Sequence, residues 1–330
     1  MLKNIHKKYF TLPCGVPIMT PAMKTYQSTS AVLMVRPTSF GFNEQTALTN
    51  TFQNHTDLTA DEVRTRATKE FDTMVAKLRE HGVHVTVFED SGTIRKPDAV
   101  FPNNWFSSWS DGHIYLYPMA TESRRVERSY SAVQALAEEF TVNRVTDISR
   151  PEQYGVALEG TGVMIFDHIN KIVYGCISPR CDASLFTSHA LELGYKPILF
   201  HAYGQDGTAV YHTNVLMGVQ STTAVICAEA ISDEAERKIV LEALRNTGHE
   251  VVEISQAQMS AFCGNVLELG NTRGETFLAM SQTAYNHFTD KQRAVLSKDK
   301  TLLPFDVSTI ETIGGGSVRC MLGENFLPKK

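Results

Sequence analysis

Residues 59–88, TADEVRTRATKEFDTMVAKLREHGVHVTVF, carry the pattern that decides the fold. Within residues 60–81 the apolar side chains recur at helical spacing, which predicts a helix with one buried face. Thr59 is placed to cap the start of this helix, and Gly82 is placed to end it. The alternating run at 83–88 is typical of a strand, so the stretch predicts a helix that leads directly into a strand.

The same order of elements recurs along the chain. Four further helices are expected, each followed by a strand, and two extended runs precede a helix, as at 163–167 and 171–177. Repeats of this kind must bury their apolar faces on one another, so five of them predict an α/β fold closed into a small propeller-like ring. The expected helix and strand pairs span residues 60–88, 123–148, 182–200, 232–254 and 282–307.

The ring is expected to form a single domain over residues 30–330, preceded by an N-terminal arm at 1–29. No linker rich in Pro, Gly or Ser divides the chain. An open doubly wound sheet is the rival interpretation, but it would call for a phosphate-binding loop. Neither GxGxxG nor GxxxxGK[ST] occurs in the sequence, which favours the ring.

Charge and composition narrow the range of partners. Lys and Arg total 31 against 36 for Asp and Glu, so the net charge of −5 gives no basic stripe for a nucleic acid. No apolar stretch approaches the roughly 20 residues that span a bilayer, and the N-terminus lacks the apolar run of a signal peptide. Six scattered cysteines without a CxxC pair fit reduced thiols and show no zinc-type spacing. We therefore expect a cytoplasmic protein that needs no metal, nucleic acid or membrane.

Polar or reactive residues occupy equivalent positions in the five units. Asn104, Glu159, His212, Asn265 and Cys320 follow one another at separations of 55, 53, 53 and 55 residues. Equivalent positions of a closed ring converge on its axis, so Glu, His and Cys are expected to meet in one active site. The segments that contain these residues are FPNNW (101–105), LEGTG (158–162), YHTNV (211–215), CGNV (263–266) and GSVRC (316–320).

Cys320 is the candidate nucleophile of this site. A cysteine in an apolar context is most often a small core residue, as expected of Cys227 within AVICA. The glycines at 314–316 change that expectation for Cys320, because they let the backbone approach a ligand closely. A histidine such as His212 can exchange protons with the leaving group and the attacking water. Glu159 can hold a cationic substrate or orient the histidine.

Several polar residues have two interpretations on residue type alone. Asn104 fits a turn or a substrate contact, and Asp98 after Pro97 fits a strand start equally well. Arg124 and Arg125, placed at an expected helix N-terminus, and Arg180, before the next helix, can be surface charges. The alternative is that these arginines grip a carboxylate.

The motifs together resemble the guanidino-group-modifying (pentein) superfamily, which includes arginine and agmatine deiminases, dimethylarginine hydrolases and amidinotransferases. The resemblance covers residues 30–322. GGGSVRCM (314–321) resembles the glycine-rich nucleophile loop of that superfamily, and HTNV (212–215) resembles its H-x-D-x-V motif. LEGTG (158–162) resembles its E-G-G/T-D strand, and DAVFPNN (98–104) resembles its D-x-V-F-x-x-D strand.

The resemblance implies a fold and a role for each candidate residue. It implies a five-bladed propeller of ββαβ repeats around a pseudo-five-fold axis, without cofactor or metal. Cys320 would be the nucleophile, His212 the general acid and base, and Glu159 the partner of the histidine and a substrate clasp. The residues implied in substrate binding are Asp98 for the α-amino group, Arg124 or Arg125 with Arg180 for the α-carboxylate, Asn104, Asn214 and the backbone of Gly315.

Three departures from the superfamily pattern point to the substrate. Asn104 and Asn214 stand where carboxylates are usual, and Gly162 replaces a third acid. Carboxylates suit a guanidinium, which only donates hydrogen bonds, whereas an amide can also donate to the carbonyl oxygen of a ureido group. The sequence therefore predicts a hydrolase of citrulline that releases ornithine, ammonia and carbon dioxide, similar to citrulline hydrolases and arginine dihydrolases.

Three alternatives stay open at this point. The first is an arginine deiminase or dimethylarginine hydrolase that stops at citrulline, and the second is an amidinotransferase. The third is a non-catalytic ring that serves as a binding module, against which the Cys, His and Glu set argues. The expected partner is a small ureido or guanidino amino acid, and a homodimer is left open. The sequence does not show what would stabilise a thiolate in front of a neutral substrate.

Overall fold

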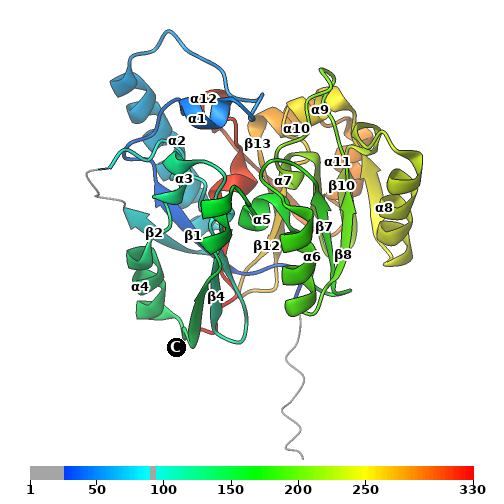
Figure 1. The fold of residues 1–330 in the computed structure, drawn as a ribbon, viewed down its shortest axis with the longest axis horizontal. Coiled ribbons are helices and arrows are strands. Elements are labelled where there is room, and N and C mark those ends of the chain that lie inside the picture. Colours follow the sequence, from blue (N-terminus) through cyan, green and yellow to red (C-terminus); the bar gives the residue numbers. More distant parts are fainter. Residues whose placement is uncertain (1–25, 90–93) are drawn as a thin grey trace, which may run out of the picture.

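The computed structural model describes residues 26–89 and 94–330 (Figure 1). Within these residues the strands form five three-stranded sheets, which confirms the α/β class. The sheets are β15 (Gly323–Glu324), β1 (Ala31–Arg36) and β2 (His84–Glu89); β3 (Phe106–Ser108), β4 (His113–Leu116) and β5 (Arg144–Asp147); β6 (Ile165–Asp167), β7 (Ile172–Cys176) and β8 (Lys196–Phe200); β9 (Met217–Val219), β10 (Thr223–Ile226) and β11 (Glu250–Glu253); and β12 (Leu267–Gly270), β13 (Thr276–Ser281) and β14 (Thr301–Phe305).

All five sheets share one connectivity. The central strand pairs antiparallel with the first strand and parallel with the third, as β4 does with β3 and β5. A parallel pair needs a crossover, and helices supply it between the second and third strands. These crossover helices are α2 (Ala60–Glu80), α4 (Tyr130–Glu139), α6 (Ala183–Glu192), α8 (Glu234–Asn246) and the pair α10 (Gln282–His287) and α11 (Asp290–Leu296).

One sheet joins the two ends of the described chain. β15, near the C-terminus, pairs antiparallel with β1, with Val32 opposite Glu324. β1 then pairs parallel with β2 in full register from Ala31 to Arg36. The first strand of this unit therefore comes from the opposite end of the chain, which the order of elements alone does not reveal.

First strands of successive sheets lie against one another. β15 contacts β3, β6 contacts β9, and β9 contacts β12. The short helix α5 (Gly160–Val163) bridges β3 and β6, and β13 contacts the 3-10 turn η4 (Val318–Met321) that precedes β15. These contacts run through the sheets in sequence order and bring the loops before the first strands together.

The helix α2 confirms the predicted local pattern. Thr59 and Glu62 form a capping box at its start. Gly82 follows its end with a φ of +78°, a conformation that glycine adopts without strain. Its buried face is made of the apolar residues at helical spacing, Val63, Ala67, Phe71, Met74, Val75 and Leu78.

Two expected single helices are each divided in the structure. The helix expected at 123–140 is α3 (Glu122–Arg125) followed by α4, because the Ser129 side chain caps a new start. The helix expected at 282–296 is α10 followed by α11, because Thr289 forms a second capping box with Gln292. Strong N-cap residues inside an apolar pattern restart a helix in a new direction.

The extended run expected at 163–167 begins instead with the end of a helical turn, and the equivalent segment of the next unit also contains a helical turn. Residues 160–163 form α5, and α7 (Thr213–Leu216) precedes β9. Glu159 therefore stands at the N-terminus of a helical turn and not at the start of a strand, which corrects the expectation. The remaining short elements are α1 (Glu44–Ala47), η1 (Pro102–Asn104), η2 (Arg150–Tyr154), η3 (Ala228–Ala230), α9 (Gln256–Ser260) and α12 (Ser308–Gly314).

The expected N-terminal arm at 1–29 lies almost entirely outside the described residues. Of its last residues, Gln27 donates to the carbonyl oxygens of Phe166 and Val219, and Thr29 forms a bridge with Leu269. These residues are therefore packed onto the sheets. Nowhere in residues 26–89 and 94–330 is a helix both long and apolar enough to span a membrane.

Candidate active site

The glycine run before Cys320 serves close packing. A Cβ on Gly314 or Gly316 would lie 2.8–2.9 Å from the ring of Phe101. Gly315 has a φ of +61°, and its carbonyl oxygen accepts the Tyr211 hydroxyl at 2.6 Å. The loop that precedes Cys320 is thus held in place by the close packing of its glycines on Phe101 and by the hydrogen bond from Tyr211.

Two amides point at the Cys320 sulfur. The Nδ2 atoms of Asn214 and Asn265 each lie 3.3 Å from Sγ, and the cysteine is only 2% exposed. Asn265 also accepts the backbone N–H of Arg319 through Oδ1 at 3.0 Å, which fixes its NH₂ group toward the sulfur. Hydrogen bonds from neutral amides stabilise negative charge that builds up on a buried sulfur.

Asn265 is a site residue that the sequence analysis did not select. Its signal was present, because it occupies the fourth of the five equally spaced positions. Asparagine has so many turn and capping roles that spacing alone gave it no chemical assignment.

His212 and Glu159 form a buried pair beside the thiol. The His212 Nε2 atom lies 2.7 Å from Glu159 Oε2, and Oε1 of the same carboxylate accepts the backbone N–H of Ala120 at 3.0 Å. The two side chains come from equivalent places, since Glu159 precedes α5 and His212 precedes α7. His212 and Cys320 line the same cavity.

Burial and neighbouring charges together determine the protonation states of His212 and Glu159. Burial lowers the pKa of His212 to about 4, although the hydrogen bond and charge of Glu159 oppose the shift. Burial alone would raise the pKa of Glu159, but Arg180 and His212 together hold it well below its usual range. The resting site therefore combines a carboxylate with a neutral imidazole, which can accept a proton.

Arg180 lies on the cavity wall next to Glu159. Its Nη1 atom is 3.5 Å from Glu159 Oε2, and its Nη2 atom donates to the Thr46 carbonyl oxygen and to the Thr49 hydroxyl. The guanidinium carbon lies 5.0 Å from the centre of the Tyr211 ring, within cation–π distance. Arg180 is 1% exposed, so it is a buried cation and not a surface charge.

Arg124 and Arg125 lie in the last turn of α3, not at a helix N-terminus as expected. Arg124 lines the cavity and donates through Nη1 to Asn104 Oδ1 at 2.9 Å. Arg125 donates to the backbone oxygens of Met119, Ala120 and Glu152, and it is not among the residues that line this cavity. The structure thus brings Arg124 to the site and leaves Arg125 beside it.

The contact with Arg124 orients the Asn104 amide. A guanidinium only donates, so the atom that it meets must be the amide oxygen. The Nδ2 atom of Asn104 is left without a partner among the described residues. A Cβ on Gly162 would lie 2.2 Å from this nitrogen, so the glycine provides the space that the amide occupies.

Asp98 is held by residues from the segment after β1. Asn43 Nδ2 and Thr46 Oγ1 donate to Asp98 Oδ2 at 2.8 and 3.1 Å. Burial raises the pKa of Asp98, while the charge of Arg124 opposes the rise. The second carboxylate oxygen, Oδ1, has no partner within the part of the chain that the structure describes.

Residues 43–54 border the cavity, which Asn50 lines directly, and we call them the cover segment. Besides binding Asp98 and Arg180, this segment donates from Asn50 to the carbonyl oxygen of Gly315. The space left beneath it is about 10 Å³, room for about one water molecule. An amino acid substrate is larger than this space, so its binding next to Cys320 requires the residues around the cavity to move apart. Nothing in the local sequence pattern marked this segment as part of the site.

A buried thiol beside a histidine–carboxylate pair, placed where small α/β units meet, defines a class. The protein is a member of the pentein superfamily and a hydrolase of carbon–nitrogen bonds other than peptide bonds. It belongs to the family described as N,N dimethylarginine dimethylhydrolase, eukaryotic, whose model matches residues 36–327. No match was found among curated protein sequences.

Solved structures share the fold at low sequence identity. ArgZ, an arginine dihydrolase from the ornithine–ammonia cycle in Cyanobacteria, superposes with a TM-score of 0.69 at 13% identity, over 89% of this chain and 40% of that one. Its substrate-bound N-terminal domain gives a TM-score of 0.68 at 14% identity, over 90% of this chain and 99% of that one. This chain thus spans only part of full-length ArgZ.

A dimethylarginine hydrolase has the same architecture. The enzyme from Pseudomonas aeruginosa, a cysteine-to-serine mutant complexed with citrulline, superposes with a TM-score of 0.61 at 12% identity. The match covers 90% of this chain and 99% of that one. At these identities the likeness establishes the fold, and the substrate must be argued from the site.

Proposed function

We propose that the protein hydrolyses the ureido group of citrulline to ornithine, ammonia and carbon dioxide, with Cys320 as nucleophile. The five sheets are interpreted as the blades of a five-bladed ββαβ propeller, in which the loops before the first strands meet at a pseudo-five-fold axis. The contacts between successive first strands support this arrangement. Sparse cysteines favour a cytoplasmic location.

The observation that carries the substrate assignment is a set of three buried polar atoms near Cys320 without partners in the described chain. They are one donor, Asn104 Nδ2, and two acceptors, Asp98 Oδ1 and Asn214 Oδ1. A citrulline offers the complementary groups: a carbonyl oxygen, ureido N–H groups and an α-ammonium. A guanidinium would leave the Asn104 donor unmatched, at a cost comparable to a lost buried hydrogen bond.

The remaining substrate contacts follow from the same geometry. Asp98 would bind the α-ammonium through its unpaired oxygen, and Arg180 would bind the α-carboxylate. Arg124 acts through Asn104, which it orients, and the Gly315 backbone would border the reacting carbon. Arg125 is the weaker candidate for the carboxylate, because Arg180 lines the Cys320 cavity and Arg125 does not.

The chemistry needs one water and no further reactant. Neutral His212 takes the thiol proton as Sγ adds to the ureido carbon, and it then gives that proton to the departing ammonia. The resulting S-carbamoyl adduct is attacked by a water that His212 deprotonates. The thiol and the carbamate of ornithine are released, and the carbamate loses carbon dioxide. The Glu159 carboxylate stabilises the imidazolium that forms in each half of the reaction.

The proposed reaction is tested by product analysis. Incubation in parallel with citrulline, arginine, agmatine and methylated arginines, scoring ornithine and citrulline separately, should give ornithine from citrulline. Accumulation of citrulline from arginine would refute the ureido assignment. An amidinotransferase would stall after its first half-reaction in the absence of an acceptor amine.

A second candidate is a dimethylarginine hydrolase, which the family match favours. It would use the same Cys320, His212 and Glu159 but stop at citrulline. The methylated substrates in the product analysis separate this function from the first.

Asn104→Asp should shift the preference toward guanidinium substrates. A carboxylate removes the donor that meets a ureido oxygen and adds a charge that attracts a guanidinium. The ratio of kcat/KM for arginine to that for citrulline should rise by about tenfold or more, as expected for one charged hydrogen bond. Asn103→Asp, at the neighbouring buried position, is the matched control. An unchanged ratio in Asn104→Asp would show that the polarity argument is wrong.

Asn265→Ala should slow the chemistry of Cys320 even without substrate. Loss of one amide donor removes stabilisation of charge on the sulfur, so alkylation by iodoacetamide at pH 7 should slow by about tenfold. Asn325→Ala, which removes another buried asparagine away from the thiol, controls for a general loss of packing. Equal alkylation rates in the Asn265 variant and the parent would exclude a role for this amide.

A further inference from the structure

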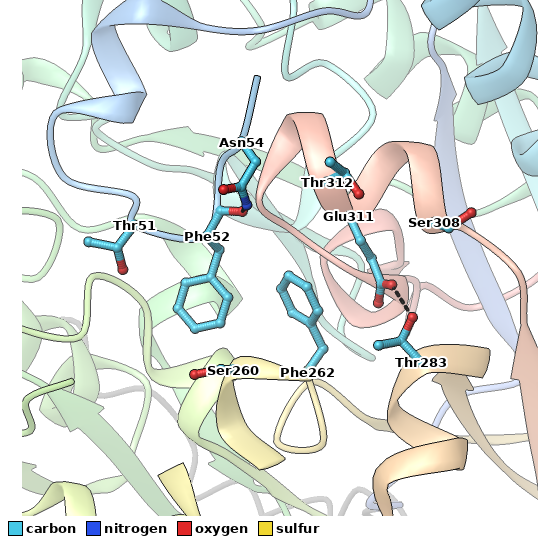
Figure 2. Close-up of a pocket in the computed structure, with 9 residues that line it drawn as sticks. All are labelled: Thr51, Phe52, Asn54, Ser260, Phe262, Thr283, Ser308, Glu311 and Thr312. Carbon is cyan, nitrogen blue, oxygen red and sulfur yellow. Dashed lines mark hydrogen bonds between the residues drawn. The ribbon is translucent and has the colours of Figure 1, made fainter. Parts of the chain in front are cut away.

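A second cavity, of about 350 Å³, shares no lining residue with the Cys320 cavity, and Figure 2 shows the side chains that line it. It lies between residues of the cover segment, the α9 end, α10 and α12. Its volume is within the range of small-molecule sites. The residues that line it include Phe52, Phe262, Thr283, Ser308, Glu311 and Thr312.

Glu311 gives this cavity a buried carboxylate. It is 5% exposed, and each of its oxygens accepts a hydroxyl: Oε1 from Ser317 at 2.6 Å and Oε2 from Thr283 at 2.7 Å. None of the ion pairs formed within residues 26–89 and 94–330 includes Glu311. Buried carboxylates in proteins are normally either paired with a cation or protonated, and Glu311 has no cationic partner among the described residues.

The surroundings of Glu311 are negative as well. The Glu70 carboxylate accepts the backbone N–H groups of Thr309 and Ile310, at the start of the same helix α12. Burial raises the pKa of Glu311, and the charge of Glu70 adds to the rise. Among the described residues, no Lys, Arg or His lines the cavity. The local field therefore favours a cation and disfavours an anion.

Two aromatic rings form the opposite wall. The rings of Phe52 and Phe262 lie side by side in Figure 2, with centroids 5.1 Å apart and planes tilted by 44°. Phe262 has a φ of +60°, a costly conformation for an aromatic residue, and this backbone turn aims its ring. Aromatic faces bind the carbon chain and the charged head of an organic cation.

We propose that this cavity is a binding site for a small alkylammonium compound, with the ammonium on Glu311 and the carbon chain against the wall formed by Phe52 and Phe262. The ammonium has three N–H donors, which the carboxylate and the hydroxyls of Ser308 and Thr312 can accept. This site is independent of the proposed reaction, because none of its lining residues lines the Cys320 cavity.

Phe52 and Glu311, on the two sides of the site, each contact a residue that is bonded to the loop carrying Cys320. Phe52 lies edge-on to Tyr211, whose hydroxyl binds the Gly315 carbonyl oxygen. Glu311 binds Ser317, whose carbonyl oxygen accepts the backbone N–H of Cys320 at 3.0 Å. An occupant of the site thus contacts the cover segment directly and is connected to the nucleophile loop through Glu311 and Ser317, so its binding should change the reactivity of Cys320.

Calorimetric titration with n-butylammonium tests the site, with n-butanol as the neutral control of similar shape. The parent protein should bind the ammonium at least about tenfold more tightly than the alcohol, since only the ammonium pairs with Glu311. Glu311→Gln should weaken ammonium binding by about tenfold. Ser308→Lys places a tethered ammonium one turn from Glu311 and leaves its hydroxyl contacts in place, so it should abolish binding.

The results distinguish binding at Glu311 from binding elsewhere on the protein. Equal binding of the ammonium and the alcohol, or binding unchanged in Ser308→Lys, would overturn the assignment, since the ligand would then bind elsewhere. Alkylation of Cys320 by iodoacetamide should change at saturating n-butylammonium in the parent and not in Ser308→Lys. Binding without any such change would refute the connection to the nucleophile. Neither readout needs turnover, so failure of the proposed citrulline reaction would leave both interpretable.

Discussion

Cys320→Ala is expected to lower kcat for citrulline by at least about 10⁴-fold. Removal of a covalent nucleophile eliminates the two-step path, and what is left is binding and electrostatic stabilisation alone. The substitution is small, and the backbone N–H of Cys320 keeps its bond to the Ser317 carbonyl oxygen. Substrate binding should therefore persist while turnover is lost. Stopped-flow release of ammonia and calorimetric binding of citrulline measure the two quantities.

A second buried cysteine provides the matched control. Cys227 lies in the core and is fully buried, as expected from the sequence, and it does not line the Cys320 cavity. Cys227→Ala should cost stability through a small cavity and leave kcat within about twofold. Full activity in Cys320→Ala would exclude the whole mechanism.

His212→Asn is expected to lower kcat by about 10³-fold, within the range of general acid and base catalysis. The asparagine keeps a polar group beside Glu159 but cannot carry the proton between thiol, ammonia and water. Alkylation of Cys320 in the variant reports whether the cavity is intact. A decrease of less than tenfold in kcat would mean that another group moves the proton.

The pH profile of the parent protein provides an independent test of His212. Since burial lowers its pKa to about 4, the imidazole stays neutral and able to accept the thiol proton well below pH 6.5. The acid side of the kcat/KM profile should therefore fall near pH 4, and protonation below that value removes activity. Circular dichroism over the same range verifies that the fold persists. An acid limb centred at pH 6.5 would contradict the buried, neutral histidine.

The order of the elements was predictable because helical and strand periodicity are local properties. The face of α2, the cap at Thr59 and the equal spacing of Glu159, His212 and Cys320 all lie in the sequence itself. The pairing of β15 with β1 was not predictable in this way, because it joins residues nearly 300 positions apart. The divided helices were missed because Ser129 and Thr289 interrupt apolar patterns that continue beyond them.

The same holds for the site: sequence spacing predicted some of its residues, whereas tertiary contacts, which the sequence does not show, determine the rest. The spacing predicted that Asn104 occupies the first of the five equivalent positions. Its role depends on Arg124, which binds the amide oxygen and leaves the amide nitrogen free. The cover segment reaches the site only through tertiary contacts such as Asn43 with Asp98. Asn265 had the spacing but no distinctive chemistry, and only its distance to the sulfur reveals what it can do.

The central claim, that Cys320 carries the ureido carbon during turnover, is tested most directly by rapid acid quench and mass spectrometry of the Cys320 peptide. The His212→Asn variant, which should form the adduct slowly and hydrolyse it more slowly still, is incubated with isotope-labelled citrulline. We predict a label on Cys320 alone, with a mass increase equal to citrulline minus ammonia. An unlabelled Cys320 while ornithine is still being formed, or a label on another cysteine, would contradict the account.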